Sequence, residues 1–308
     1  MTHCHHGHHH HHHAPGEYNR AFAIGVLLNT VYIAVEAGCG FYWGSLALLA
    51  DAGHNLSDVL GLLLAWGAHY LSGFKPTERR TYGWGSSSIL ASLVNAIILL
   101  IAMGGIAWES VRRLIDPSDV AVPGLTIMIV AGIGVVINTL TALMFMKGSE
   151  KDLNIRGAYL HMAADAAVSL GVVLGGLAIL QFGWNWVDPA LSLLIVVVIV
   201  WGTWGLLRDS ANLALAAVPA GIDPRQVREF LESQPQVTEI HDLHIWAMST
   251  TDNALTAHLV CAEPIRDEHF LGNIASKLRE QFDIHHSTIQ IEGTHAAEHC
   301  EQAPPDVI

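Results

Sequence analysis

Residues 120–146 read VAVPGLTIMIVAGIGVVINTLTALMFM, and no charged residue interrupts them. A helix of about 20 mostly apolar residues crosses the hydrocarbon core of a bilayer, so this stretch predicts a transmembrane helix. In the whole chain, 51% of the residues are apolar and 14% are charged. A soluble domain carries about 25% charged residues. The composition therefore predicts a membrane protein and argues against a soluble enzyme.

Five further stretches are similarly long and apolar, which gives an α-helical membrane protein with six transmembrane helices. The six cover approximately residues 21–43, 46–71, 87–111, 121–146, 156–182 and 187–207. Lys and Arg are more frequent in the loops on the side of the two termini, whereas Arg112 and Arg113 lie on the opposite side. Because loops rich in Lys and Arg stay in the cytoplasm, we expect both termini to be cytoplasmic.

From Asp209 onward the sequence has the pattern of a small α/β domain. Asp223 and Pro224 are suited to begin a helix, and strand-like segments cover about residues 239–248 and 254–261. A helix over 270–282 and a strand over 287–292 complete an α-β-β-α-β order, which predicts a ferredoxin-like fold. The expected parts are a His-rich tail (1–19), a transmembrane domain (20–208), a cytoplasmic domain (209–295) and a C-terminal tail (296–308).

Charge and histidine are distributed unevenly along the chain. Up to Arg208 there are 12 acidic and 10 basic residues, whereas from Asp209 there are 16 acidic and 5 basic residues. An acidic domain repels nucleic acid and attracts metal cations, so we expect divalent metal ions and no nucleic acid as partners. Nine of the 20 histidines lie between residues 3 and 13, although the run His8–His13 also fits an expression tag.

Two of the predicted transmembrane helices carry the same polar motif. His54 and Asp58 lie in the second helix, and His161 and Asp165 lie in the fifth, each pair four residues apart. A spacing of i, i+4 places both side chains on one helix face. A single pair is more often a polar contact within a bundle, but two copies at matching depth favour a metal site. Two nitrogens and two oxygens suit tetrahedral Zn²⁺ better than Mg²⁺.

Three other ionisable residues lie in the predicted membrane helices. Asp51 precedes His54 by three residues and could share its face, while Glu36 lies in the first helix and His69 near the end of the second. An interfacial carboxylate or a hydrogen-bonded interior group explains each of them as well as a role in transport does. Their functions therefore stay open.

The C-terminal domain is also rich in histidine. His241 lies in the first predicted strand, His258 in the second and Glu292 in the third, so the three side chains could converge on a second cation, with His285 close by. A lone histidine in a strand is usually structural. The density of histidine in this domain favours the metal site.

Five segments resemble a cation diffusion facilitator of the zinc-transporting type. They are SLALLADAGHNLSD (45–58), GAYLHMAADAAVSLG (157–171), HDLHIW (241–246), LTAHLV (255–260) and HSTIQIE (286–292). The resemblance implies a homodimer in the bacterial inner membrane that exports Zn²⁺ from the cytosol in exchange for protons. It assigns the transport site to His54, Asp58, His161 and Asp165. It assigns a cytoplasmic regulatory site to His241, His258 and Glu292.

Relatives with a His-Cys-His tail use it to complete another cytoplasmic site in the neighbouring subunit. By that resemblance, the additional site would recruit His3, Cys4, His5, His285 and Cys300. The chain departs from many relatives at residues 82–88, which read YGWGSSS where those relatives carry charged residues. Its loop 147–154 also lacks the usual histidines.

Two alternatives to transport use the same metal ligands. An intramembrane zinc metalloenzyme requires a general base beside the metal, and neither membrane pair forms the His-Glu-x-x-His motif that would supply one. The sequence therefore disfavours an enzyme. A zinc sensor that does not transport would carry the same ligands, and only a flux measurement separates it from a transporter.

Overall fold

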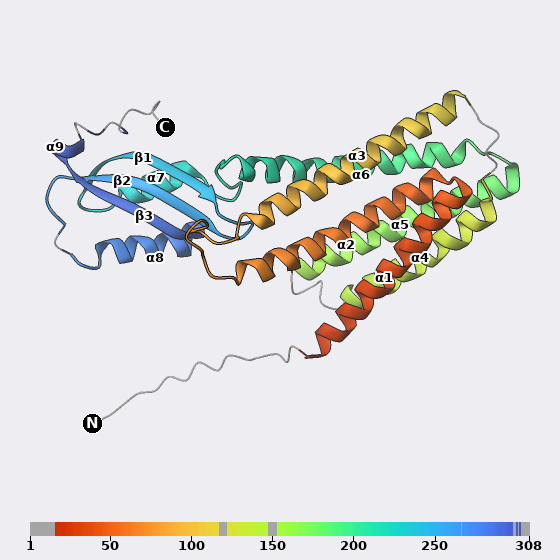
Figure 1. Cartoon of the computed structure of the whole chain (residues 1–308), viewed down its shortest axis with the longest axis horizontal. Helices are drawn as coiled ribbons and strands as arrows, with labels where there is room; N and C mark the ends of the chain where they lie inside the picture. The colour runs from red at the N-terminus through yellow and green to blue at the C-terminus, as the bar shows by residue number, and fades with distance from the viewer. Residues whose placement is uncertain are drawn as a thin grey trace. The chain divides into compact units, whose positions relative to one another are not determined.

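The computed structural model describes residues 16–116, 122–146, 153–265, 267–297, 300 and 302 (Figure 1). Six long helices precede the C-terminal domain, and each overlaps one of the six predicted segments. They are α1 (Gly16–Trp43), α2 (Leu46–Ser72), α3 (Ser87–Ile115), α4 (Gly124–Met146), α5 (Leu153–Phe182) and α6 (Val187–Ala214).

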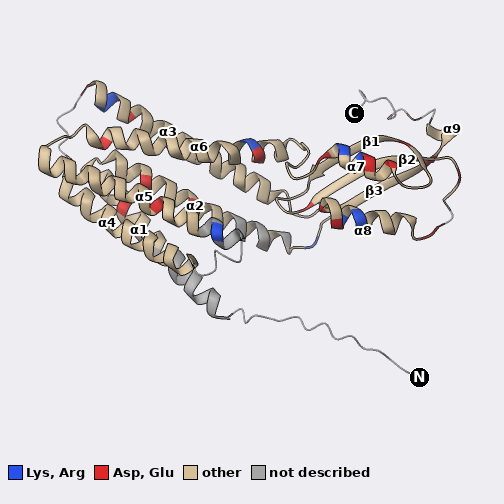
Figure 2. Cartoon of the chain, turned by 180° about the vertical axis from the view of Figure 1, so that it is seen from behind, with Lys and Arg blue, Asp and Glu red and all other residues tan. Residues whose placement is uncertain are grey.

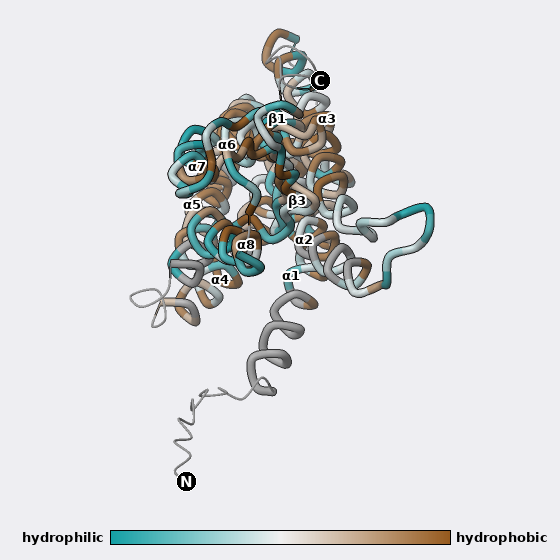
Figure 3. Tube along the Cα trace, turned by 90° about the vertical axis from the view of Figure 1, so that its left-hand side faces the viewer, coloured by the Kyte–Doolittle hydropathy of each residue, from teal (hydrophilic) through white to brown (hydrophobic). Residues whose placement is uncertain are grey.

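The helices expose apolar side chains in a way that fits lipid rather than water. Among the described residues, four helices (α3 to α6) are long and apolar enough to cross a membrane. Trp201 on α6 is 83% exposed and Trp108 on α3 is 75% exposed, alongside many exposed Leu, Ile and Val side chains. Charged residues are sparse on these helices (Figure 2), and much of their length is apolar (Figure 3). These features identify a helical membrane domain.

The chain forms two compact units. The first joins the described residues up to Val59 with Met103–Val197, and the second joins Leu60–Ala102 with the described residues from Val198 onward. Helices α2, α3 and α6 therefore each contribute to both units. The membrane His and Asp pairs all belong to the first unit, and the candidate ligands of the strands all belong to the second.

In the first unit, a residue of α6 caps the beginning of α2. The buried Asp188 carboxylate accepts hydrogen bonds from the backbone N–H groups of Leu46 (2.8 Å) and Ala47 (3.3 Å). The Ser45 hydroxyl donates to the same carboxylate over 2.6 Å. The first N–H groups of a helix have no partner within it, and a negative charge at that end interacts favourably with the helix dipole. Asp188 thus fixes the start of α2 about two turns before His54.

Helices α4 and α5 approach each other closely through glycines. A Cβ atom added to Gly176 of α5 would lie 2.8 Å from the carbonyl oxygen of Gly124 on α4, which is closer than real Cβ contacts come. Small residues allow helix backbones to pack tightly in lipid. The glycines therefore help to position α5, which carries His161 and Asp165.

The C-terminal domain contains a three-stranded sheet with two main helices (Figure 1). Strand β1 is antiparallel to the central strand β2, and β3 is parallel to it. Asp223 caps the first helix by accepting a hydrogen bond from the backbone N–H of Arg225 (2.9 Å), as the Asp-Pro pair predicts. The predicted α-β-β-α-β order is confirmed. The elements are α7 (Pro224–Glu232), β1 (Val237–Ala247), β2 (Asn253–Cys261), α8 (Phe270–Phe282), β3 (Ile284–Gly293) and a short α9 (Thr294–Ala297).

The core of this domain lies between the sheet and its helices. Leu231 of α7 and Leu278 of α8 are 0% exposed, and both belong to one apolar cluster with Ala257 and Leu259 of β2. Because successive strand residues point to opposite faces of a sheet, His258 points away from this core. The sheet therefore presents His258 and its register partner His241 on the face opposite this core.

Candidate metal sites

The His-x-x-x-Asp pairs of α2 and α5 face each other in the first unit. Each imidazole contacts the carboxylate of the opposite helix: His54 Nε2 lies 3.2 Å from Asp165 Oδ1, and His161 Nε2 lies 3.1 Å from Asp58 Oδ2. Each of the four residues offers a ligating atom, and these atoms all lie within 4.8 Å of one another. The structure therefore brings together the four residues that the sequence singles out.

The cluster has an open side and a closed side. The His161 side chain is 43% exposed, whereas that of Asp165 is 3% exposed. Asp165 Oδ2 has no hydrogen-bond partner among the described residues. A buried carboxylate oxygen without a donor is unfavourable, so this atom is available to a cation. Two imidazole nitrogens and two carboxylate oxygens at these distances can bind a cation tetrahedrally.

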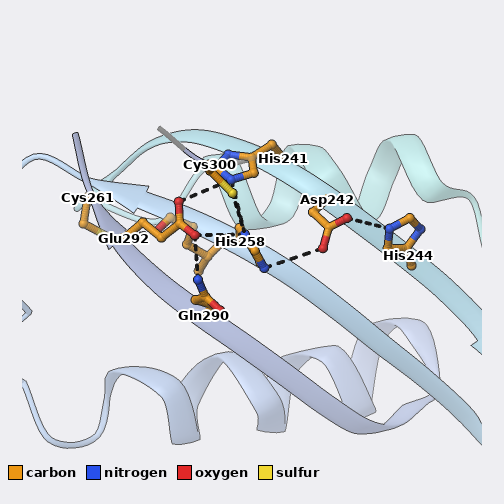
Figure 4. Close-up of polar contacts among 9 residues, drawn as sticks. His241, Asp242, His244, His258, Cys261, Gln290, Glu292 and Cys300 are labelled. Carbon is orange, nitrogen blue, oxygen red and sulfur yellow. Dashed lines mark hydrogen bonds and ion pairs between the residues drawn. The ribbon is translucent and has the colours of Figure 1, made fainter. Parts of the chain in front are cut away.

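A second cluster lies on the face of the C-terminal sheet opposite its apolar core (Figure 4). His241 of β1 is the register partner of His258 of β2, and His241 Nε2 lies 3.3 Å from His258 Nδ1. Glu292 of β3 contacts both rings, with Oε1 2.9 Å from His258 Nδ1 and Oε2 3.3 Å from His241 Nε2. All three residues are buried. The structure thus brings together the three strand residues that the sequence singles out.

Cys300 joins this cluster from the segment that follows α9. Its Sγ lies 3.8 Å from His258 Nδ1, and the ligating atoms of the four residues lie within 4.8 Å of one another. Figure 4 shows the thiol beside the His241 ring. Imidazole nitrogen, carboxylate oxygen and thiolate sulfur are all ligand atoms of Zn²⁺, and the set supplies four of them.

The other predicted ligands of the cytoplasmic region do not belong to this cluster in the described part of the chain. His285 lies at the start of β3, where its Nε2 is 3.6 Å from Asp283. The structure therefore brings Cys300 to His258 and not to His285, with which the family resemblance grouped it. The tail residues His3, Cys4 and His5 lie outside the described part of the chain. The side chain of His69 is outside it as well.

Asp242 supports the cytoplasmic cluster, although the sequence analysis did not single it out. The register between β1 and β2 shifts between His241 and His244, and Asp242 has a positive φ of 50° there. This bulge directs the Asp242 carboxylate toward His258 Nε2 (3.5 Å) and His244 Nε2 (2.7 Å). A carboxylate on one ring nitrogen orients the other nitrogen toward a metal. Strand alternation alone gives no signal for such a bulge.

Cys261 lies near the cluster but does not belong to it. Its thiol lies 3.9 Å from the Leu259 carbonyl oxygen, to which it donates, and burial raises the pKa of this thiol. Because the thiolate is the form that binds metal, a raised pKa disfavours Cys261 as a ligand. Cys300 is therefore the cysteine that fits the site.

Comparison with known families agrees with this arrangement. A family model described as the cation efflux transmembrane domain matches residues 22–213. A second, described as the cytoplasmic domain of cation efflux proteins, matches residues 219–294. The chain belongs to the cation efflux family. The resemblance to cation diffusion facilitators is thereby confirmed.

Relatives in this family match nearly the whole chain. A "Cadmium, cobalt and zinc/H(+)-K(+) antiporter" of Bacillus velezensis is 36% identical over 285 residues, which covers 91% of this chain and 90% of the relative. "Metal cation efflux system protein CzcD" of Cupriavidus metallidurans is 35% identical over 290 residues, covering 94% and 90%. "Zinc transporter ZitB" of Escherichia coli is 36% identical over 273 residues, covering 88% and 86%. The chain is therefore a cation transporter, and the alternative of an intramembrane metalloenzyme is wrong.

Proposed function

We propose that this cation efflux protein exports Zn²⁺ from the cytosol in exchange for protons, with the cluster on α2 and α5 as its transport site. The observation that carries the proposal is the convergence of two imidazoles and two carboxylates, within 4.8 Å, in a helical membrane domain. This donor set suits tetrahedral zinc. The names of the relatives, which include a zinc transporter and an antiporter for zinc, support the same substrate class.

The chemistry of the ligands couples zinc to protons. Zinc binds neutral imidazole and ionised carboxylate, so bound protons and bound zinc exclude each other at one site. The cross-helix contacts of 3.2 Å at His54 and 3.1 Å at His161 are compatible with the proton-loaded form. A site open to a neutral cytosol favours zinc, and a site open to a more acidic medium favours protons. Alternation between the two openings converts a proton gradient into metal export.

We also propose that α1 to α6 all span the bacterial inner membrane, with both termini in the cytoplasm. Six helices place the termini on one side, and the loops on that side carry more Lys and Arg than the opposite loops. The transmembrane domain then covers residues 20–208 and the cytoplasmic domain residues 209–295, with tails at 1–19 and 296–308. The bacterial origin of the relatives supports the choice of membrane.

The cluster of His241, His258, Glu292 and Cys300 is proposed to bind zinc as a regulatory site in a homodimer. His241, His258 and Glu292 are buried and Cys300 is partly buried, whereas the transport site is open at His161. Zinc sites with four protein ligands are usually structural, and open sites exchange their occupants. The family model of the cytoplasmic domain carries a dimer designation, which supports the homodimer. The tail residues His3, Cys4 and His5 are proposed to raise the local zinc concentration near the cytoplasmic mouth, and by the family resemblance they would join His285 in a further cytoplasmic site.

Zinc flux into proteoliposomes tests the transport site. The Asp165→Ala variant loses one ligand and the only nearly buried carboxylate of the cluster, so we expect uptake driven by a pH gradient to fall to the level of protein-free liposomes. Asp116→Asn, which neutralises an exposed carboxylate just after α3, is the matched control and should transport like the wild type. Wild-type flux in Asp165→Ala contradicts the proposed site. Zinc binding without any flux in the wild-type protein indicates a sensor instead.

A further inference from the structure

The cluster on α2 and α5 is exposed toward one end of these helices. Its contacts pair His54 with Asp165 and Asp58 with His161, so α2 and α5 run antiparallel. Side-chain exposure rises in the same direction along both helices. It is 3% at Asp165 and 22% at His54, and it reaches 33% at Asp58 and 43% at His161. The cluster therefore opens toward the end of α2 and the beginning of α5, which is the cytoplasmic end in the proposed topology.

The opposite end of the cluster is closed by packed residues. Leu46 is the first residue of α2 and precedes His54 by about 12 Å along the helix axis. Over this stretch, residues 45–48 and 50–52 are all buried. On α5, Ser169 lies one turn beyond Asp165 and is 0% exposed. Zinc that leaves toward this end must therefore pass a part of the protein that is packed in this structure.

A buried polar network joins α2, α3 and α6 at the closed end. The Ser110 hydroxyl of α3 donates to Ser192 Oγ of α6 over 3.1 Å, and the Ser192 hydroxyl donates to the Leu46 carbonyl oxygen of α2 over 3.3 Å. Both serines are 0% exposed. Asp188 lies one turn before Ser192 on α6, and its carboxylate accepts the hydrogen bonds from Ser45 and the start of α2. Two successive turns of α6 therefore bind the first turn of α2.

An arginine joins the turn between α1 and α2 to α3 at the same end. Arg113 Nη1 donates to the Gly44 carbonyl oxygen over 2.6 Å, and Arg113 Nε donates to Glu109 Oε1 over 3.0 Å. Arg113 lies one turn after Ser110 on α3, so its contact extends the serine network. We call the set that holds the beginning of α2 against α3 and α6 the outer clasp. It consists of Ser45, Ser110, Arg113, Asp188 and Ser192.

The chemistry of the outer clasp suits a closure that opens and forms again. Its links between helices are hydrogen bonds from hydroxyl, guanidinium and backbone N–H groups. Such groups exchange a protein partner for water at a small net cost, whereas in lipid they are expensive to leave unpaired. The clasp lies at helix ends, where water can replace its hydrogen bonds when the helices separate. It is therefore stable when closed and can open into water.

We propose that the outer clasp is the gate on the non-cytoplasmic side of the transport site, and that zinc leaves only when α2 separates from α3 and α6 there. The inference rests on the proposed function, because exchange of zinc for protons requires a site that opens to one side at a time. In this structure the cluster is open at one end and closed at the other. The closed clasp thus belongs to the state that is open to the cytoplasm.

A disulfide across the clasp tests the gate. Ser45 Oγ lies 2.6 Å from Asp188 Oδ1, so cysteines at these positions can approach each other. In a Cys39→Ala parent in proteoliposomes, we expect oxidation of the double variant Ser45→Cys with Asp188→Cys to abolish zinc flux. Reduction, followed by removal of the reductant, should restore the flux of its reduced form. Zinc binding by calorimetry should be equal in both forms, because the cluster stays open to the cytoplasm. Each single cysteine variant is a control and should transport equally when oxidised and reduced.

Thiol labelling from outside the cell gives a second measurement that leaves Asp188 intact. The Ser192→Cys variant, in the same parent, carries its thiol at a position that is 0% exposed when the clasp is closed. The parent lacks Cys39 because that thiol lies in the last turns of α1, on the labelled side. In intact bacteria loaded with zinc, a membrane-impermeant maleimide should label the variant. Labelling should be lost when Asp165→Ala, which stops turnover, is added.

The outcomes separate the gate from the proposed function. If the disulfide is present by mass spectrometry and the oxidised double variant transports like its reduced form, the proposal is wrong. It is equally wrong if the Ser192→Cys variant stays unlabelled while the cells export zinc. A parent protein without any zinc flux contradicts the proposed function, and the gate fails with it.

Discussion

At the scale of single residues, the ligand atoms determine which cation the transport site accepts. The His54→Asp variant would leave one imidazole and three carboxylates in the cluster. Because oxygen donors favour harder and larger cations than mixed nitrogen and oxygen donors do, we expect the ratio of zinc flux to Mn²⁺ and Cd²⁺ flux to fall. Competitive uptake into proteoliposomes measures this ratio, with Asp116→Asn as the control. An unchanged ratio would show that the imidazole of His54 does not set the selectivity.

Residues differ in how well the sequence predicts their place. The convergence of His54 with Asp165 was predictable, because the helical period fixes one face for each pair and desolvation makes unpaired membrane carboxylates rare. Cys300 was not predictable as a partner of His258, because it follows the four-residue helix α9 at a position without regular structure, which sequence spacing does not define. The position of Asp242 was not predictable, because regular strand alternation places it on the face opposite His241, and the bulge in β1 changes that alternation.

At the scale of elements, the cap on α2 determines how firmly the helix with His54 and Asp58 is held. Asp188→Ala would leave the N–H groups of Leu46 and Ala47 without their acceptor, and an unsatisfied buried group costs about 1–3 kcal/mol. We expect a lower thermal midpoint in detergent and reduced zinc flux. Asp188→Asn keeps an acceptor oxygen and should recover part of both. An unchanged midpoint in Asp188→Ala would show that the cap adds nothing to stability.

The elements themselves were largely predictable, with exceptions at their ends. Helix α8 covers the predicted residues 270–282, and α2 begins at the predicted Leu46. Helix α6 continues past the predicted residue 207 to Ala214. Its final turns contain polar residues, so their hydropathy no longer indicates a membrane span although they remain helical. Hydropathy marks where lipid contact ends and does not mark where a helix ends. The cap from Asp188 joins residues that are 142 apart in the sequence, and no local pattern reports such a contact.

At the scale of the whole molecule, the negative charge of the cytoplasmic domain predicts that zinc changes the distance between the two domains of the proposed homodimer. From Asp209 onward the chain carries 16 acidic and 5 basic residues, so two copies repel each other when no metal is bound. Zinc at the proposed regulatory site of His241, His258 and Glu292 would reduce this repulsion and crosslink the three strands. Compaction follows only if zinc binds the compact state more tightly than the splayed state, since equal affinities shift no population.

We therefore expect the double variant His241→Ala with His258→Ala to lose most of the zinc-induced shortening between labels on the two cytoplasmic domains. Flux should fall without being abolished, because coupling between two sites is typically about 5–150-fold. Cys261→Ala is the control, since this thiol is buried close to the cluster but outside it, and it should compact like the wild type. The distance between labels, measured with and without zinc in the full-length protein, tests whether these two histidines are required for compaction. Normal compaction in the double variant would show that the charge of these domains is neutralised elsewhere.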